Sequence, residues 1–205
     1  MINEIVKDKT VPLTFAVLQN VARSIRLSPE EENFFISLLH QKTYPKKENI
    51  LTPGQVCREQ NYVIKGCLKV YYLDNEGQEH IVKFAIEDWW AFDIESFSQS
   101  TPSFYGISCL EDTTVFQLSQ EAYEILLKRV PAFEKFYRLI LQNSFIALQH
   151  RMTQSLALTA QDRYVRFQEK YPGLEKRISQ KNVAAYLGIT PVFLSMIRRE
   201  DLVKH

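Results

Sequence analysis

The sequence predicts an α+β protein in which an antiparallel β-barrel or jelly roll is followed by one long helix and a C-terminal pair of short helices. Three observations support this architecture. Runs rich in Val, Ile, Tyr and Phe, separated by turn residues, fill residues 46–118. Apolar residues then recur at spacings of three and four over residues 131–158. Near the C-terminus, Gly188 separates two segments that each begin with a capping residue.

The first predicted helix begins at Ser28 and runs to about His40. Ser28 is a good N-cap, Pro29 suits the first helical position, and Glu31 completes a capping box.

The barrel is predicted from short strands separated by turn signals. The signals are Pro53-Gly54, Gly66 and the run Asn75-Glu76-Gly77. Several such hairpins in a row are typical of a barrel or jelly roll, and residues 109–119 read as its closing strand.

Ser119 begins a short helix that ends near Val130, and Pro131 opens the long helix. At 1.5 Å per residue, residues 131–158 span roughly 40 Å. One wide apolar stripe contains Phe133, Phe136, Tyr137, Ile140, Leu141, Phe145, Leu148, Met152 and Leu156. This stripe could pack only on its own barrel. We favour the alternative that it also forms the seam of a homodimer.

The C-terminal segment begins with a helix capped by Thr159 that stops before Pro172-Gly173, and a helix pair follows. Ser179 and Thr190 are the expected N-caps of this pair, with Pro191 at the first position of the second helix. The expected inward residues are Val183, Ala184, Leu187, Ile189, Leu194 and Ile197. These offsets are those of a helix-turn-helix, which places its second helix in the major groove of DNA. The alternative is a helical hairpin that only packs.

The charge distribution favours nucleic acid as the partner of this pair. The whole chain has a formal net charge of +1. Residues 160–205 carry nine Lys or Arg and five Asp or Glu, a net of +4, whereas residues 1–159 carry sixteen and nineteen, a net of −3.

The order of these parts resembles the Crp/Fnr family of transcriptional regulators. The stretch "YVIKGCLKVYYLDNEGQEHIVKF" is similar to the barrel hairpins of that family, and "RISQKNVAAYLGITPVFLSMIRR" is similar to its DNA-binding motif. The resemblance implies a sensor domain at 1–130, a dimerisation helix at 131–158 and a helix-turn-helix domain at 159–205. It also implies a cytoplasmic homodimer that binds double-stranded DNA, with a small-molecule effector and RNA polymerase as further candidate partners.

The cassette that binds the cyclic phosphate in nucleotide-binding members of the family differs here. Asp93, preceded by Phe92, stands where those members have a Glu after a Gly, and Phe104 and Tyr105 stand where they have Arg-Ser. No Lys or Arg occurs between Lys83 and Lys128. A buried phosphate needs a fixed cation, so we do not expect cyclic AMP to bind.

The same region is aromatic, and a densely packed barrel without a ligand is the interpretation that we slightly favour. The alternative is a pocket for an apolar or aromatic effector. Its candidate lining is Phe84, Trp90, Phe92, Asp93, Phe104 and Tyr105.

The second helix of the pair also departs from the family, because Pro191, Val192 and Met196 replace the residues that contact base edges. The candidate DNA contacts are Lys181, Thr190, Pro191, Val192, Ser195, Met196, Arg198 and Arg199, with Lys204 as a further phosphate contact. Only six residues follow Arg199, too few for the β-wing that many members carry, so the domain is expected to lack one.

Other classes of function receive no support from the sequence. Cys57, Cys67 and Cys109 lack metal-site spacing and read as reduced, buried thiols, and His80 reads as an ordinary strand residue rather than a haem ligand. No apolar run approaches the length of a membrane span, the N-terminus lacks the apolar core of a signal peptide, and no nucleophile–base pair suggests an enzyme. No cofactor is expected. The remaining rival is a ligand-binding or scaffold protein that has kept the fold and lost sequence-specific DNA reading.

Overall fold

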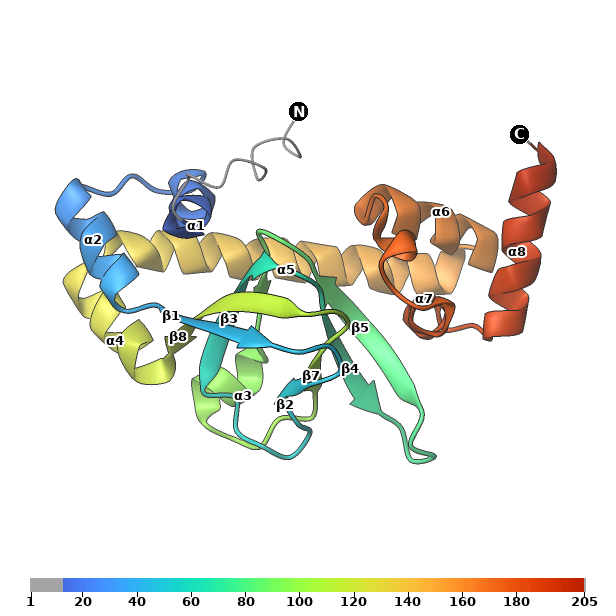
Figure 1. Ribbon diagram of the computed structural model, residues 1–205, viewed down its shortest axis with the longest axis horizontal. Coiled ribbons are helices and arrows are strands. Elements are labelled where there is room, and N and C mark those ends of the chain that lie inside the picture. Colours follow the sequence, from blue (N-terminus) through green and yellow to red (C-terminus); the bar gives the residue numbers. More distant parts are fainter. Residues whose placement is uncertain (1–12, 205) are drawn as a thin grey trace.

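The computed structural model describes residues 13–204, with side chains described as far as Arg199. A single long helix, α5 (Ala132–Ala157), runs the length of the molecule and organises everything else. The β-barrel lies against its middle, one group of helices lies at its N-terminal end, and a second group lies at its C-terminal end (Figure 1).

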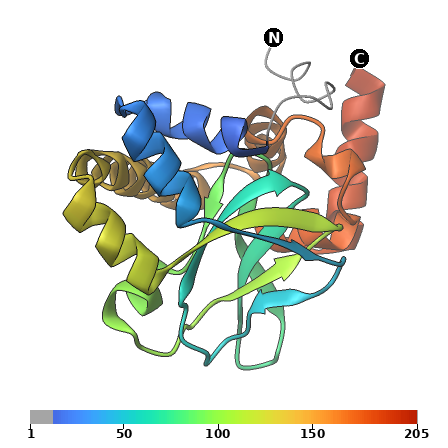
Figure 2. The same cartoon turned by 60° about the vertical axis from the view of Figure 1, so that its left-hand side comes forward.

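Three helices gather at the N-terminal end of α5, on one side of the sheets (Figure 2). They are α1 (Leu13–Ala22), α2 (Pro29–Ser37) and α4 (Gln120–Arg129). The predicted caps are confirmed: Ser28 forms a capping box with Glu31, and the Ser119 side chain accepts a hydrogen bond from the amide of Ala122. Helix α2 ends at Ser37, slightly earlier than predicted, because a strand begins at His40.

The barrel consists of two four-stranded antiparallel sheets, which confirms the expected jelly-roll class. One sheet has the order β1-β8-β3-β6 and the other has the order β2-β7-β4-β5. The strands are β1 (His40–Tyr44), β2 (Asn49–Leu51), β3 (Glu59–Lys65), β4 (Leu68–Leu73), β5 (Glu79–Ala85), β6 (Trp90–Ala91), β7 (Gly106–Cys109) and β8 (Thr113–Ser119). A short helix, α3 (Ile94–Gln99), lies between β6 and β7.

Gly66 ends the turn between β3 and β4 in a conformation that only glycine adopts easily. Its φ is +105°, and an added Cβ would lie 2.8 Å or less from three atoms of the neighbouring Asp112 and Thr113 backbone and side chain. This hairpin therefore depends on a glycine at the position where the sequence predicted a turn.

Helix α5 has two halves with different surroundings. Phe133, Phe136 and Tyr137 in the first half are buried against α1, α2 and the barrel. The apolar residues of the second half, from Leu141 onward, are largely exposed. The stripe that appears continuous in the sequence therefore divides into a packed segment and an uncovered segment.

The C-terminal helices share a hydrophobic core with the barrel. These helices are α6 (Ala160–Lys170), the 3-10 helix η2 (Leu174–Lys176), α7 (Gln180–Leu187) and α8 (Pro191–Lys204). Phe84 of β5 contacts the rings of Phe167, Tyr171 and Tyr186. The two parts of the chain are therefore packed together rather than joined only by a linker.

Two arginines reinforce this junction. Arg177 donates to Glu87 at 2.7 and 2.9 Å and also pairs with Glu111. Arg151 of α5 donates to the carbonyl oxygens of Ile81 and Tyr186 at 2.7 and 3.0 Å and also to that of Val82. Charge-assisted bonds of this kind are stronger than neutral ones, so they fix the position of the C-terminal helices on β5.

Candidate nucleic-acid interface and effector cavities

Helices α7 and α8 form a tight pair whose geometry follows from local sequence. The Ser179 side chain accepts a hydrogen bond from the amide of Asn182 and begins α7. Gly188 ends α7 in the left-handed conformation, with φ of +68°, as predicted. Thr190 then accepts from the amide of Phe193 at the start of α8. The predicted inward residues Val183, Ala184, Leu187, Leu194 and Ile197 are buried, and Ile189 is partly buried.

Helix α8 stands at the edge of the molecule with one face clear of other elements (Figure 1). Val192 and Met196 on this face are 73% and 52% exposed, and Arg199 is exposed as well. Residues 192, 196 and 199 follow the helical repeat, so they lie in one row. Pro191 and Thr190 are exposed at the N-terminal end of the same helix.

Besides Thr190, which caps α8, two more of the predicted DNA contacts already have partners within the chain. The hydroxyl of Ser195 accepts a hydrogen bond from Gln180 at 2.8 Å and donates to the carbonyl oxygen of Pro191 at 3.0 Å. Arg198 lies 3.3 Å from a carboxylate oxygen of Glu175. Lys181 and Arg199 are exposed and form no ion pair among the described residues. The free polar surface of the pair is therefore sparse.

In the cassette region of the barrel, the carboxylate of Asp93 forms hydrogen bonds within the protein. Asp93 is buried; it accepts from the amide of Glu95 at 3.1 Å and from the hydroxyl of Ser103 at 2.6 Å. Ser103 in turn accepts from the amide of Tyr105 at 3.0 Å. Asp93 therefore caps α3 and ties the two ends of the cassette together.

The exposed part of α5 presents an apolar row to solvent. Its members are Leu141, Phe145, Leu148, Met152 and Leu156, which are between 42% and 79% exposed. Their spacings of four, three, four and four residues keep them on one side of the helix. We call this row the α5 stripe.

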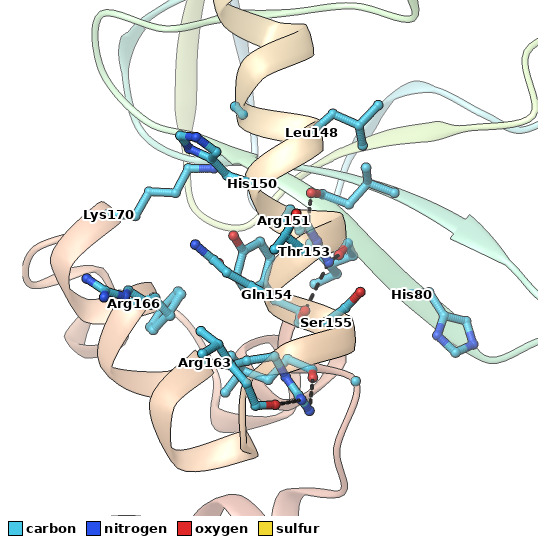
Figure 3. A pocket seen from close by; sticks show the side chains of 18 of the residues that line it. His80, Leu148, His150, Arg151, Thr153, Gln154, Ser155, Arg163, Arg166 and Lys170 are labelled. Atoms are coloured by element: carbon cyan, nitrogen blue, oxygen red, sulfur yellow. Dashed lines mark hydrogen bonds between the residues drawn. The ribbon is translucent and has the colours of Figure 1, made fainter.

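Two open cavities border the flank of α5 next to the α5 stripe. The first, of about 1100 Å³, lies between α5, β5, α6 and α7 (Figure 3). Figure 3 shows Arg151 and Arg163 turned toward backbone carbonyl oxygens, while Lys170 extends from α6 across the opening. The second, of about 750 Å³, lies between α1, the end of β5 and α5. Arg151 and Lys170 border both cavities.

Comparison with known families finds a likeness in the barrel region. Residues 41–130 match the model of the cyclic nucleotide-binding domain, which covers β1 almost from its start and continues through α4. This segment therefore resembles a cyclic nucleotide-binding domain. Sequence comparison with curated proteins gives no match.

Solved structures extend the likeness to most of the chain. The c-di-GMP-responsive global regulator CLP of Xanthomonas campestris is 14% identical, with a TM-score of 0.67 over 86% of this chain and 93% of that one. FixK2 of Bradyrhizobium japonicum is 16% identical, with a TM-score of 0.70 over 81% and 85%. A protein from Eubacterium rectale assigned to the Crp/Fnr family of transcriptional regulators is 17% identical, with a TM-score of 0.67 over 87% and 85%. The chain therefore has the fold of the Crp/Fnr regulators, as its sequence predicted.

Within this segment, the six predicted effector residues do not gather around one cavity. Phe84 packs against the C-terminal helices, Trp90 contacts the Tyr62 ring, and Phe92 contacts Phe97. Phe104 is 64% exposed, and its ring contacts Tyr105 and Tyr72. Of the six, only Trp90 lines either of the two large cavities on the flank of α5.

Sequence reasoning missed three of the cationic side chains that line the second cavity. Arg23 follows α1, Lys83 lies on β5 and Lys170 ends α6. A lysine inside an otherwise apolar strand, as in "HIVKFA", was the available signal for Lys83. Nothing local to Arg23 or Lys170 indicates that the fold brings them together.

Two searches of the described part of the chain gave negative results. Residues 13–204 contain no group of three His, Cys, Asp or Glu side chains placed to hold a metal ion. Among the helices of the same residues, none is both long enough and apolar enough to cross a membrane.

Proposed function

We propose that the chain is a dimeric transcription regulator of the Crp/Fnr type that binds duplex DNA through α7 and α8. In this proposal residues 1–130 are the sensor domain, residues 131–158 are the dimerisation helix and residues 159–205 are a helix-turn-helix domain without a wing. The observation that carries the proposal is the exposed row on α8. A packing hairpin would bury that face, whereas a recognition helix must leave it open.

Dimerisation follows from the α5 stripe. Five large apolar residues in one row are unusual on the surface of a monomer, and patches of this kind mark interaction sites. The heptad-like spacings suit a second copy of the same helix, as in a two-stranded coiled coil. A C2 dimer formed along α5 presents its two copies of α8 together, as binding to two half-sites of one operator requires.

The sensor domain is not expected to use a cyclic nucleotide. Asp93 stands at the ribose-binding position of the family pattern. Its carboxylate already accepts hydrogen bonds from the Glu95 amide and the Ser103 hydroxyl. Phe104 and Tyr105 stand at the phosphate positions and supply no positive charge. The family name of this domain therefore describes its fold here and not its ligand.

A second candidate function is supported by the occupied polar groups of α8. Because Ser195 is bonded to Gln180 and Arg198 is paired with Glu175, few side chains remain to contact base edges. A protein that keeps the fold as a scaffold would show the same pattern.

Selection of bound sequences from random duplex DNA with purified protein tests the DNA-binding proposal. Arg199 is the groove-facing residue that can grip a guanine with two hydrogen bonds. Arg199→Ala should cost about 1–3 kcal/mol per half-site and relax preference at one base pair. Lys181→Ala should weaken binding to all sequences alike and lower the salt slope by about one unit per contact. Val192 and Met196 can contact thymine methyl groups, so A·T-rich half-sites are expected.

Lys128→Ala provides the matched control, because Lys128 is an exposed lysine at the end of α4, at the far end of α5 from α8 (Figure 1). It should leave both affinity and salt slope unchanged. Absence of duplex binding by the wild-type protein at low salt would overturn the DNA proposal in favour of the scaffold. Equal losses on every sequence for Arg199→Ala and Lys181→Ala would show that Arg199 contacts only phosphate.

A further inference from the structure

The second cavity, which we call the flank cavity, has an unusual lining for a protein with almost no net charge. It lies between α1, the end of β5 with the loop that follows, and the middle of α5. Four cationic side chains border it, namely Arg23, Lys83, Arg151 and Lys170, against one carboxylate, that of Asp88. The cavity wall therefore carries an excess of positive charge.

Asp88 does not neutralise this excess, because both of its carboxylate oxygens already interact with other side chains. One carboxylate oxygen pairs with Arg23. The other accepts from Asn20 at 2.9 Å and from the Tyr62 hydroxyl at 2.8 Å. Asp88 and Arg23 therefore form one neutral pair at the rim, which leaves three cations.

The three remaining cations have no carboxylate partner among the described residues. Lys83 donates to the carbonyl oxygen of Trp90 at 2.8 Å and lies over the Trp89 ring at 5.6 Å. Lys170 lies over the Tyr171 ring at 5.4 Å. Among the described residues, Arg151 donates only to backbone carbonyl oxygens. The ammonium groups of Lys83 and Lys170 therefore each keep N–H donors free for a ligand.

The folded protein holds these charges together at a cost. Burial, together with a smaller effect of the nearby Lys170 charge, lowers the pKa of Lys83 to about 8. Burial and the charge of Arg151 also lower the pKa of Lys170. A bound anion would relieve both the repulsion and the lost hydration.

Aromatic surface lies directly beside the charges. Trp89 and Trp90 line the flank cavity together with Phe136. Trp90 is fixed by a hydrogen bond from its indole nitrogen to Asn20 at 3.1 Å, whereas Trp89 is only partly buried. A cavity that combines convergent cations with an accessible ring face suits a ligand that has both a ring and negative charge.

We propose that the flank cavity binds a phosphorylated ring compound of the linear nucleotide class, with its phosphates at Lys83 and Lys170 and its ring beside Trp89. The three cations favour a ligand with at least two negative charges. A cyclic nucleotide carries a single charge and matches them less well. The site is separate from the cassette around Asp93, and the proposal does not depend on DNA binding.

The two tryptophans of the sequence both line this cavity, so fluorescence excited at the red edge of tryptophan absorption reports on it directly. The full-length protein is titrated with ADP as the probe, in low-salt buffer without DNA. Adenosine serves as the ring without charge, pyrophosphate as the charge without a ring, and cyclic AMP as the singly charged ring. ADP should change the signal with a Kd below about 1 mM, and each of the other three should bind at least about tenfold more weakly.

Lys83→Gln and Lys170→Gln should each weaken ADP binding about tenfold or more, which corresponds to the loss of one charge-assisted contact. Lys170 is exposed at the end of its helix, so its variant tests the site even if Lys83→Gln alters folding. Lys128→Gln is the matched control and should bind ADP as the wild type does. No signal change at millimolar ADP overturns the proposal. Equal affinity for pyrophosphate overturns the role of the ring, and equal losses in the Lys128 variant would indicate general attraction without a site.

Discussion

Phe145 allows the proposed dimer to be tested without disturbing the folded chain. Its side chain lies in the middle of the α5 stripe and is 60% exposed. Because it makes few contacts within its own chain, Phe145→Ala should change the free energy of unfolding of an isolated chain by no more than about 0.5 kcal/mol. If a second copy of α5 covers the stripe, the same change should weaken association strongly.

The expected magnitude follows from the exposed area. A Phe side chain presents about 200 Å², so roughly 120 Å² of Phe145 remains to be covered by a partner. At about 25 cal/mol per Å², covering this area contributes about 3 kcal/mol. Alanine retains part of it, so the loss is about 2 kcal/mol per chain and about 4 kcal/mol for the symmetric pair. This corresponds to a dissociation constant that is roughly a thousandfold weaker.

Sedimentation velocity over a concentration series measures the change. The wild type should be dimeric at micromolar concentration, and Phe145→Ala should be monomeric there. Ile125→Ala is the matched control, because Ile125 is 45% exposed on α4, away from the α5 stripe. A wild-type protein that sediments as a monomer, or a Phe145 variant that remains dimeric, would refute the assignment of the stripe to a dimer seam.

Three further predictions concern the barrel and its junction. Calorimetry with cyclic AMP or cyclic GMP at millimolar concentration should show no binding at the cassette, because Phe104 and Tyr105 provide no cation; a micromolar dissociation constant would contradict this. The pKa of Lys83 is about 8 in the folded chain and about 10.5 in the unfolded chain, so the folded state loses this proton first as the pH rises. The free energy of unfolding of the wild type should therefore rise from pH 8 to about pH 10.5. Chemical denaturation measures this rise, and Lys83→Gln should abolish it. Burial opposes ionisation of Glu87, but hydrogen bonding to Arg177 lowers its pKa, so the free energy of unfolding should fall as the pH drops below about 4.5. Arg177→Ala should be about 1–3 kcal/mol less stable than the wild type at pH 7. Its free energy of unfolding should then fall less than that of the wild type on acidification.

The helix boundaries could be predicted from the sequence because caps are local. Ser28, Ser119, Thr159 and Ser179 each accept a hydrogen bond from an amide three residues later. The information therefore lies within one turn of helix. Gly188 is equally local, since its left-handed conformation needs no distant contact.

The junction between the barrel and the C-terminal helices could not be predicted in this way. Phe84 looked like an effector-pocket residue because it lies in an aromatic strand, yet its ring packs on Tyr171, 87 residues later in the chain. Ile140 looked like a seam residue because of its spacing, yet it is partly buried with the barrel core. The sequence prediction does not include helix α1. These features depend on contacts between distant segments, which periodicity does not encode.

Arg151 joins three parts of the molecule, and its two roles can be separated. Its guanidinium connects α5 to the carbonyl oxygens of β5 and α7, while its charge borders the flank cavity. A lysine in its place keeps the charge but cannot reach three carbonyl oxygens with one planar group. Arg151→Lys should therefore bind ADP within about threefold of the wild type but show faster amide hydrogen exchange in α7. Arg151→Met should lose both the affinity and the protection.

Hydrogen exchange resolved by mass spectrometry and the fluorescence titration measure these two effects on the same samples. Exchange in α4 is the internal control, since α4 lies at the opposite end of α5 (Figure 1). Unchanged protection of α7 in Arg151→Lys would show that the shared core around Phe84 holds the helix without the arginine. Weakened ADP binding in Arg151→Lys would show that the shape of the guanidinium, and not its charge alone, forms the wall of the flank cavity.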